Sequence, residues 1–283
     1  MTAAPLAPEI QIDEHASAGE AHAFLEQHRI YGAYAIADLD GEAAVARWWI
    51  ARREQRPLAL LLVVESLPFR PTFAVGDPQA IGELVRDGLH ETRVLVSAPV
   101  PARPGIEAIY RFERCDLMQR MAVDATAFRP RIESPVTRLG PDQLDDIIEL
   151  YGHVSRSYFT PERVSREIYY GVYSGRTLVA AAGTHVQSSR SGLAAVGNVL
   201  TRPAFRSQGM ATSVTSAVTE AALALHRDVV LNVRADNSAA VRVYQGLGYR
   251  VHAPFIEGPA IRRAGWERFT HKLFRTNDGG DYA

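Results

Sequence analysis

The stretch that most constrains this chain is a short apolar strand, a glycine-containing loop and a helix, which follow one another within residues 194–226. Ala194–Leu200 is short, apolar and partly β-branched, which predicts a buried strand. Thr212–His226 has small and apolar residues at helical spacing, which predicts a helix. The loop between them directs several backbone N–H groups to one point, where the helix dipole adds about half a positive charge. We therefore expect an anion-binding loop.

The loop reads Arg206-Ser-Gln-Gly-Met-Ala211. Gly209 lets the backbone approach a phosphate without a Cβ in the way, and Ala211 keeps the first helical turn small. A P-loop is excluded because it needs Gly-Lys-Ser/Thr, and Lys272 is the only lysine. The Gly-x-Gly-x-x-Gly fingerprint of dinucleotide-binding folds is also absent. An ordinary tight strand-to-helix loop remains the alternative for this motif alone.

A second strand and helix follow directly. Asp228–Arg234 is apolar and predicts another buried strand. Asn237 or Ser238 is a good helix N-cap, and the glycines at 246 and 248 predict the end of that helix. This segment therefore repeats the strand-then-helix arrangement of the first.

Two motifs, Arg-x-x-Gly-x-Ala at 206–211 and Asn-x-x-Ala-x-x-x-Tyr-x-x-x-Gly-Tyr at 237–249, resemble the donor site of the GCN5-related N-acetyltransferase (GNAT) superfamily. Their order and separation also match. The resemblance covers about residues 135–255 and implies a GNAT-like α/β fold with a mixed sheet, and acetyl-CoA as co-substrate.

The resemblance also implies roles for single residues. The side chain of Asn237 would bond the pantetheine arm, and Tyr244 would protonate the departing thiolate. For Tyr244, a ring that only packs on the sheet remains the alternative. The donor-binding set is then Val199, Leu200, Arg206, Ser207, Gln208, Gly209, Met210, Ala211, Thr212 and Asn237.

The general base is less clear from the residues. Several family members have a glutamate on the strand before the loop, where this chain has Ala195. His185, or a water held by Asn198, is the candidate, because histidine titrates near neutral pH. A merely hydrogen-bonded strand histidine is the alternative. Tyr169 and Tyr170 would line the acceptor pocket, or one of them belongs to the core.

The first half has a similar rhythm of strands and helices and resembles a decayed copy of the same fold. Its comparable loop carries Asp77, an N-cap followed by proline at the first helical position, whose charge would repel a pyrophosphate. We therefore expect a structural domain or a wall of the acceptor site, with a working twin as the alternative. Among its elements we expect a helix at 15–27, strands at 30–37, 57–65, 71–75 and 92–97, a helix at 42–53 and a proline-rich loop at 99–104.

The length of 283 residues suits two domains of about 100–200 residues each. We place them at 1–128 and 129–283, with a linker near 125–135. The net charge of −1 argues against a nucleic-acid or membrane-surface partner. The single cysteine, Cys115, excludes an intrachain disulfide, and no metal-binding motif is present. Without a signal peptide or a bilayer-length apolar run, we expect a cytoplasmic protein, and the arginine- and alanine-rich composition suggests a bacterial one.

Together these features predict an acetyl-CoA-dependent N-acetyltransferase with one active and one degenerate GNAT domain. The acceptor is an unidentified amine on a small molecule or peptide, and a homodimer is left open. A longer acyl donor or an alcohol acceptor is an alternative within the same class. A non-enzymatic acyl-CoA-binding regulator is the alternative outside it, kept open by the missing glutamate.

Overall fold

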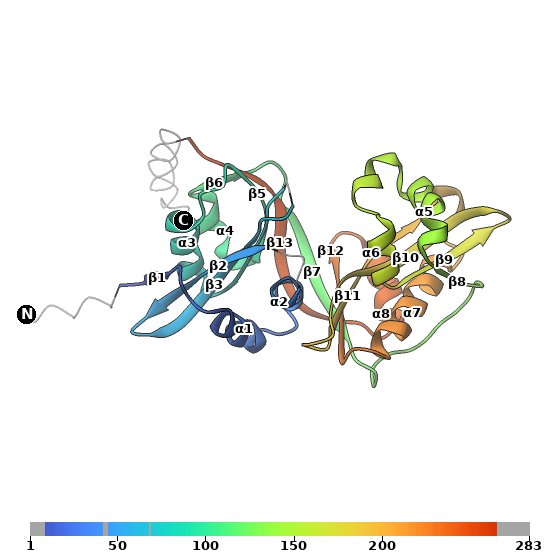
Figure 1. The fold of residues 1–283 in the computed structure, drawn as a ribbon, viewed down its shortest axis with the longest axis horizontal. Coiled ribbons are helices and arrows are strands. Elements are labelled where there is room, and N and C mark those ends of the chain that lie inside the picture. The colour runs from blue at the N-terminus through green and yellow to red at the C-terminus, as the bar shows by residue number, and fades with distance from the viewer. Residues whose placement is uncertain (1–8, 42–44, 68, 265–283) are drawn as a thin grey trace, which may run out of the picture. The chain divides into compact units, whose positions relative to one another are not determined.

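The computed structural model describes residues 9–41, 45–67 and 69–264 (Figure 1). The chain forms two compact units, residues 1–117 with 254–283, and residues 118–253. The linker composition suggests a division at 128/129. Two strands instead belong to the unit on the other side of that division. β7 (Asp116–Val123) pairs with β12 in unit 2, and the end of β13 (Arg250–Arg262) pairs with β5 in unit 1. Linker composition cannot predict these pairings, because each joins segments that are far apart in sequence.

Unit 1 is a sheet of mixed direction with helices inserted between its strands. Its strands follow the order β1-β2-β3-β4-β5-β13, with β6 paired to β13, and only β4 and β5 run parallel. Its elements are β1 Gln11–Asp13, α1 Ala18–Gln27, α2 Ala33–Asp40, β2 Ala46–Arg53, β3 Arg56–Val64, β4 Pro71–Gly76, α3 Pro78–Asp87, β5 Arg93–Pro99, η1 Val100–Ala102, α4 Arg103–Glu107 and β6 Tyr110–Phe112.

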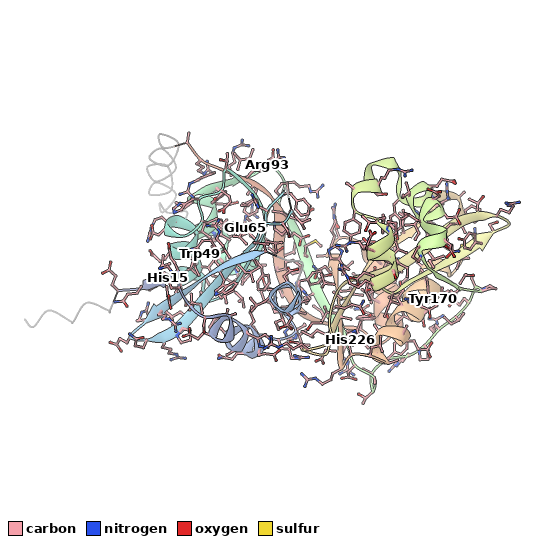
Figure 2. The ribbon with its side chains drawn as sticks, in the orientation of Figure 1. His15, Trp49, Glu65, Arg93, Tyr170 and His226 are labelled. Carbon is pink, nitrogen blue, oxygen red and sulfur yellow. The ribbon has the colours of Figure 1, made fainter. Side chains whose placement is uncertain are left out.

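Two expected elements of unit 1 are exchanged in type. The strand predicted at 30–37 is wrong, because α2 begins at Ala33, where alanine-rich sequence favours helix and buried residues recur at helical spacing. The helix predicted at 42–53 is also wrong from 46 onward, and residues 42–44 lie outside the described ones. Trp48 and Trp49 sit on a strand and point to opposite faces. Trp49 is in the core (Figure 2), whereas Trp48 donates its Nε1–H to the carbonyl of Ala16 at 2.8 Å.

The other predicted elements of unit 1 are confirmed, except for the proline-rich loop. The strands at 57–65, 71–75 and 92–97 are confirmed as β3, β4 and β5, and the helix at 15–27 is confirmed from Ala18, with Ser17 as its N-cap. The proline-rich loop at 99–104 instead forms η1 and the start of α4, since proline is well tolerated in the first turn of a helix.

Unit 2 has the strand order β7-β12-β11-β10-β9-β8, in which only β11 and β12 run parallel. Its further elements are β8 Thr137–Leu139, η2 Pro141–Gln143, α5 Leu144–Tyr151, η3 His153–Ser157, α6 Pro161–Arg166, β9 Tyr169–Ser174, β10 Thr177–Ser188, β11 Leu193–Thr201, η4 Pro203–Phe205, α7 Met210–Leu223, β12 Asp228–Arg234 and α8 Ser238–Gly246. β9 and β10 form a hairpin whose turn contains Gly175, with φ of 58°.

Helices cover both faces of the sheet in unit 2 (Figure 1). Val214 and Val218 of α7 pack with Val196 and Leu231 of the parallel pair on one face. On the other face, the apolar side of α5 packs against Leu178, Ala181 and Tyr169. We call these the α7/α8 face and the α5/α6 face.

The chain repeats one succession of elements: two helices, three strands, a helix, a strand, a helix and a strand. The succession runs first from α1 to β6 and then from α5 to β13, the last strand of which pairs with β5 of unit 1. The parallel pair falls at the same place in each succession. The repeat agrees with a fold present in two tandem copies.

Candidate functional site

The loop between β11 and α7 has the backbone of an anion site. Ser207 and Gly209 both adopt left-handed conformations, with φ of 61° and 73°. Gly209 is the N-cap of α7, and no side chain caps this helix end. The first intrahelical donor is Ser213, which bonds the carbonyl of Gly209 at 3.0 Å. The N–H groups of Met210, Ala211 and Thr212 therefore precede the helical ladder and are oriented toward an incoming anion.

The polar side chains of this loop are exposed and held only by long contacts. Nε of Arg206 donates to the carbonyl of Thr201 at 3.3 Å, and Nε2 of Gln208 donates to that of Ala204 at 3.4 Å. Neither contact engages a charged partner. Both side chains can thus turn to a ligand at little cost.

A carboxylate lies unexpectedly beside this loop. A Cβ on Gly209 would collide with the carboxyl group of Glu133. Nη2 of Arg131 pairs with that carboxylate at 2.6 Å. Glu133 could not be predicted from the sequence, because it precedes the loop by many residues and no local motif marks it.

The parallel pair separates next to the loop. The β11–β12 ladder runs from Leu193 opposite Asp228 to Val196 opposite Leu231, and the register goes no further. Beyond that point β11 continues to Thr201, paired with β10. A strand edge with free N–H and C=O groups can pair with an amide-containing chain, as in β-strand addition.

A β-bulge lies in this free part of β11. Leu200 and Gly197 pair with Ala181 and Gly183, so that Asn198 and Val199 together oppose one residue of β10. Asn198 has φ of 52°, a conformation that asparagine tolerates better than most residues. Val199 packs on the α7/α8 face, and Leu200 packs on the α5/α6 face.

A cluster of polar side chains holds the bulge from the α5/α6 face. Nδ2 of Asn198 donates to the hydroxyls of Tyr158 and Tyr169, at 3.3 and 3.2 Å. The hydroxyl of Tyr151 donates to the backbone carbonyl of Asn198. The Tyr158 hydroxyl also contacts Nδ1 of His185 at 3.0 Å. We call Tyr151, Tyr158, Tyr169, His185 and Asn198 the bulge cluster.

Arg163 of α6 completes this environment. Its Nη1 donates to the Tyr158 hydroxyl at 3.1 Å and to the His185 carbonyl at 3.4 Å. Its guanidinium lies 4.3 Å from the centre of the Tyr158 ring, in cation–π contact. Arg163, Tyr158 and Tyr151 were not predicted from the sequence, since none of them lies in a recognisable motif.

The hydrogen bonds fix the tautomer of His185. Arg163 and Nδ2 of Asn198 can only donate, and together they take both acceptor positions of the Tyr158 oxygen. The phenol must therefore donate its own proton to Nδ1 of His185, which leaves the proton of the ring on Nε2. Burial, with help from the Arg163 charge, lowers the pKa of His185 from 6.5 to about 4. His185 is consequently neutral at pH 7.

The remaining predicted residues lie on α8. Oδ1 of Asn237 accepts from the N–H of Ala240 at 3.2 Å, which confirms the predicted N-cap. Tyr244 is 7% exposed within the α7/α8 face, and its ring meets that of Tyr249 edge-on at 6.1 Å. Burial raises the pKa of Tyr244 to about 12. Tyr244 and the bulge cluster therefore flank β11 from opposite faces.

Tyr169 and Tyr170, which were both predicted to line the acceptor pocket, lie in different surroundings. Tyr169 is fully buried in the bulge cluster, whereas the ring of Tyr170 lies under the guanidinium of Arg138 at 5.4 Å. The nearest buried carboxylate, Glu167, already accepts from Thr184 at 2.7 Å and Gln187 at 2.9 Å. In the described ranges, no group of three or more His, Cys, Asp or Glu side chains is arranged to hold a metal ion.

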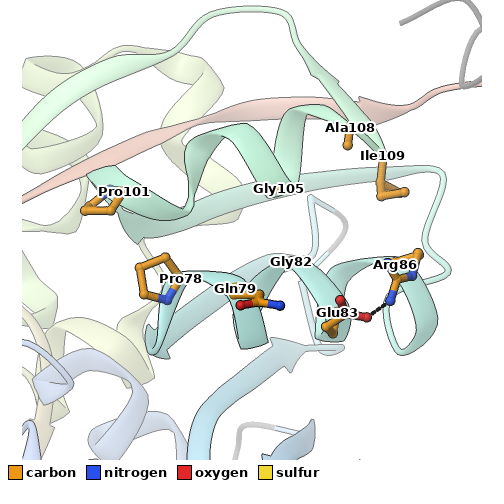
Figure 3. A pocket seen from close by; sticks show the side chains of 9 residues that line it. All are labelled: Pro78, Gln79, Gly82, Glu83, Arg86, Pro101, Gly105, Ala108 and Ile109. Atoms are coloured by element: carbon orange, nitrogen blue, oxygen red, sulfur yellow. Dashed lines mark ion pairs between the residues drawn. The ribbon is translucent and has the colours of Figure 1, made fainter. Parts of the chain in front are cut away.

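Unit 1 differs at the equivalent helix. Oδ1 of Asp77 accepts from the N–H of Ala80 at 2.9 Å, so a carboxylate caps the N-terminus of α3. A shallow pocket lies between α3 and α4, with Glu83 and Arg86 paired at its edge (Figure 3). Gly82 and Gly105 let the two helices approach closely there. None of the helices that the structure describes is both long and apolar enough to cross a membrane.

Comparisons with known proteins agree with this fold. Residues 169–254, from β9 into β13, match a family described as FR47-like protein. A GNAT-family acetyltransferase from Novosphingobium aromaticivorans is 22% identical with a TM-score of 0.54, covering 72% of this chain and 89% of its own. A GCN5-related N-acetyltransferase from Kribbella flavida is 17% identical with a TM-score of 0.56, covering 84% and 95%.

A tandem GNAT protein from the clavulanic acid biosynthesis pathway is 12% identical with a TM-score of 0.53, and the match covers 89% of this chain and 98% of that one. The comparison with curated proteins found no match. The chain therefore has the fold of the GCN5-related N-acetyltransferases, and residues 169–254 match the FR47-like family model.

Proposed function

We propose that the protein is an acetyl-CoA-dependent N-acetyltransferase whose working site lies in unit 2. One observation carries the proposal: β11 leaves β12 after Val196, and the loop beyond it ends at the uncapped N-terminus of α7. This junction offers N–H donors to a doubly charged anion and a free strand edge to a chain of amides. Acetyl-CoA has both features, as a pyrophosphate and a pantetheine arm.

The loop residues hold the donor in this proposal. Backbone N–H groups of residues 207–212 and the guanidinium of Arg206 bind the pyrophosphate. Hydrogen bonds to charged groups contribute about 1.5–3 kcal/mol each. The backbone of Val199 and Leu200 pairs with the pantetheine amides. The side-chain NH₂ group of Asn237 binds the same arm. The shared alignment of these groups fixes the position of the thioester.

In the reaction, an amine nitrogen of the acceptor attacks the thioester carbonyl carbon. A C–N bond forms, the C–S bond breaks, and the thiolate takes up a proton. We assign that proton to Tyr244, whose phenol stays protonated at neutral pH. The bulge cluster holds the backbone of Asn198 and Val199 so that an N–H of this segment meets the developing oxyanion.

We assign the amine proton to solvent water. His185 is not assigned as the base, because its Nδ1 is taken by Tyr158 and its pKa of about 4 makes it a weak base. Asn198 acts through the bulge. The acceptor enters on the α5/α6 face, near Tyr169, His185 and Asn198.

A non-enzymatic acyl-CoA-binding regulator is the second candidate. The position of Ala195 on β11 favours it, since this part of the strand offers no carboxylate base, and Glu167 is already engaged by its neighbours. Such a protein would bind the donor through the same loop. It would lack only turnover.

Two measurements separate these candidates. Titration calorimetry with acetyl-CoA tests the donor site, and release of free thiol with a panel of primary amines tests turnover. We expect micromolar-range binding and thiol release that depends on the amine. Binding with only slow, amine-independent release would identify the regulator, and absence of binding would remove both candidates.

A further inference from the structure

We propose that Glu133 sets the affinity of the donor loop. Its carboxylate lies against Gly209 and has to turn away when a pyrophosphate binds, a role that rests on the proposed function. Glu133 belongs to the segment 129–134, which we call the strap. The strap passes from the end of α8 to the beginning of α7.

Backbone hydrogen bonds hold the strap in place. The N–H of Arg129 donates to the carbonyl of Leu247 at 3.0 Å. The N–H of Arg131 donates to Oγ of Ser216 at 2.9 Å, and those of Glu133 and Ser134 donate to Oγ of Ser213 at 2.9 and 3.0 Å. Ser213 and Ser216 are both fully buried. The path of the strap along α7 is therefore fixed at its backbone.

The side chain of Glu133 is held far less firmly. Its distal contact is the ion pair with Arg131, in which the two side chains are 42% and 55% exposed. Exposed pairs of this kind contribute little to stability, because solvent screens them. The carboxylate can therefore leave its position while the strap backbone stays bound.

The position of the Glu133 carboxylate matters because it lies directly against Gly209 of the donor loop. Gly209 has no side chain, and the space that a Cβ would fill holds a carboxylate oxygen of Glu133, with the Cδ and Cβ of Glu133 close beside it. A negative charge there is favoured by the N-terminus of α7 while no ligand is bound. The same negative charge repels a pyrophosphate that enters the loop. The net attraction of the α7 N-terminus for that pyrophosphate is therefore smaller than it would be without Glu133.

A purely structural role predicts something different. If Glu133 only stabilised the N-terminus of α7, removing its charge would lower the midpoint of thermal unfolding and leave donor affinity unchanged. If it competes with the donor, the same change tightens binding. The two roles therefore differ in the sign and place of their effects.

The test compares Glu133→Gln with a matched control, Glu220→Gln. Glu220 is exposed and lies ten residues further along α7, about 15 Å from the loop. We expect Glu133→Gln to tighten acetyl-CoA binding about three- to tenfold at low salt, and less at high salt. The control should change affinity less than twofold. Equal affinities for wild type and Glu133→Gln would overturn the proposal.

A second ligand isolates the pyrophosphate. S-acetylpantetheine carries the thioester and amides of the donor without the pyrophosphate, so its affinity should be the same in wild type and Glu133→Gln. Tighter binding of both ligands in the variant would refute a charge effect at the loop. If wild type and variant both fail to bind acetyl-CoA, the proposed function itself fails, which is a different result from unchanged affinity.

Arg131 provides a check of opposite sign. Arg131→Gln removes the cation that partly neutralises Glu133, so it should weaken acetyl-CoA binding. The double variant should bind as tightly as Glu133→Gln alone, because the two residues act through one carboxylate. Weakening by the same factor in both backgrounds would mean that Arg131 meets the donor directly, and would contradict the coupling.

Discussion

The hydroxyl of Tyr158 donates its proton to Nδ1 of His185 across 3.0 Å. Because Arg163 and Asn198 both donate to the same hydroxyl, the direction of this bond is determined. It makes His185 a neutral donor at Nε2 and ties it, through Asn198, to the bulge in β11. His185 is the residue type best suited to a general base, but its hydrogen bond from Tyr158 instead ties it to the bulge in β11.

The first prediction concerns the pH dependence of turnover. His185→Gln should lower the rate with a working amine acceptor, but the shape of the pH–rate profile between pH 5 and 9 should not change. The glutamine replaces the imidazole beside Tyr158 but holds the bulge cluster less well, and neither side chain titrates in this range. A limb that is present in wild type and missing in the variant would restore His185 as the base.

The second prediction concerns stability in acid. The folded pKa of His185, about 4, lies below its ordinary value of 6.5, so the unfolded chain binds the proton first as pH falls. This contribution is complete above about pH 6.5 and is lost as pH falls toward 4. It amounts to at most about 3 kcal/mol.

Denaturant unfolding of wild type and His185→Gln at pH 7 and pH 4.5 measures this contribution. The wild type should lose more stability between the two values than the variant does. Burial also lowers the pKa values of His28, His226 and His252, so the variant should retain some pH dependence. Identical losses in both proteins would show that His185 is not buried as described.

The third prediction concerns Tyr244. Tyr244→Phe keeps the buried ring and removes only the phenol proton, so donor affinity should be unchanged while turnover falls by as much as about 10²–10⁴-fold. Tyr249→Phe is the control, since its hydroxyl bonds Thr219 at 2.8 Å within the same core. That control should lose stability and keep its turnover. Wild-type turnover in Tyr244→Phe would assign the proton to water.

The fourth prediction concerns Gly209. Gly209→Ala forces a Cβ into a left-handed residue and against Glu133, so it should cost about 1–2 kcal/mol of stability and weaken acetyl-CoA binding. Gly175→Ala is matched to it, with φ of 58° and no neighbouring atom within 4 Å of the new Cβ.

We therefore expect both glycine variants to lower the midpoint of thermal unfolding and only Gly209→Ala to lower affinity. Calorimetry with acetyl-CoA, done well below both midpoints, separates the two effects. Equal loss of affinity in the two variants would point to general destabilisation. Unchanged affinity in Gly209→Ala would remove the loop from the donor site.

Local sequence determined several parts of this protein by itself. The loop after β11, the capping by Asn237 and Asp77, and the turn at Gly175 all follow from residue types that prefer one backbone conformation. Continuous apolar runs likewise predicted β3 and β12. Such features need only a few adjacent residues, so they can be read from the chain.

Tertiary structure decided the rest. Residues 33–40 and 46–53 took the opposite of the expected type, since pairing with β3 outweighed the propensity of the segment around Trp48. The bulge at Asn198, the bond between Tyr158 and His185, and the contact of Glu133 with Gly209 each join segments far apart in sequence. Local preferences cannot specify such contacts, because they form only when strand register and helix packing bring distant side chains together.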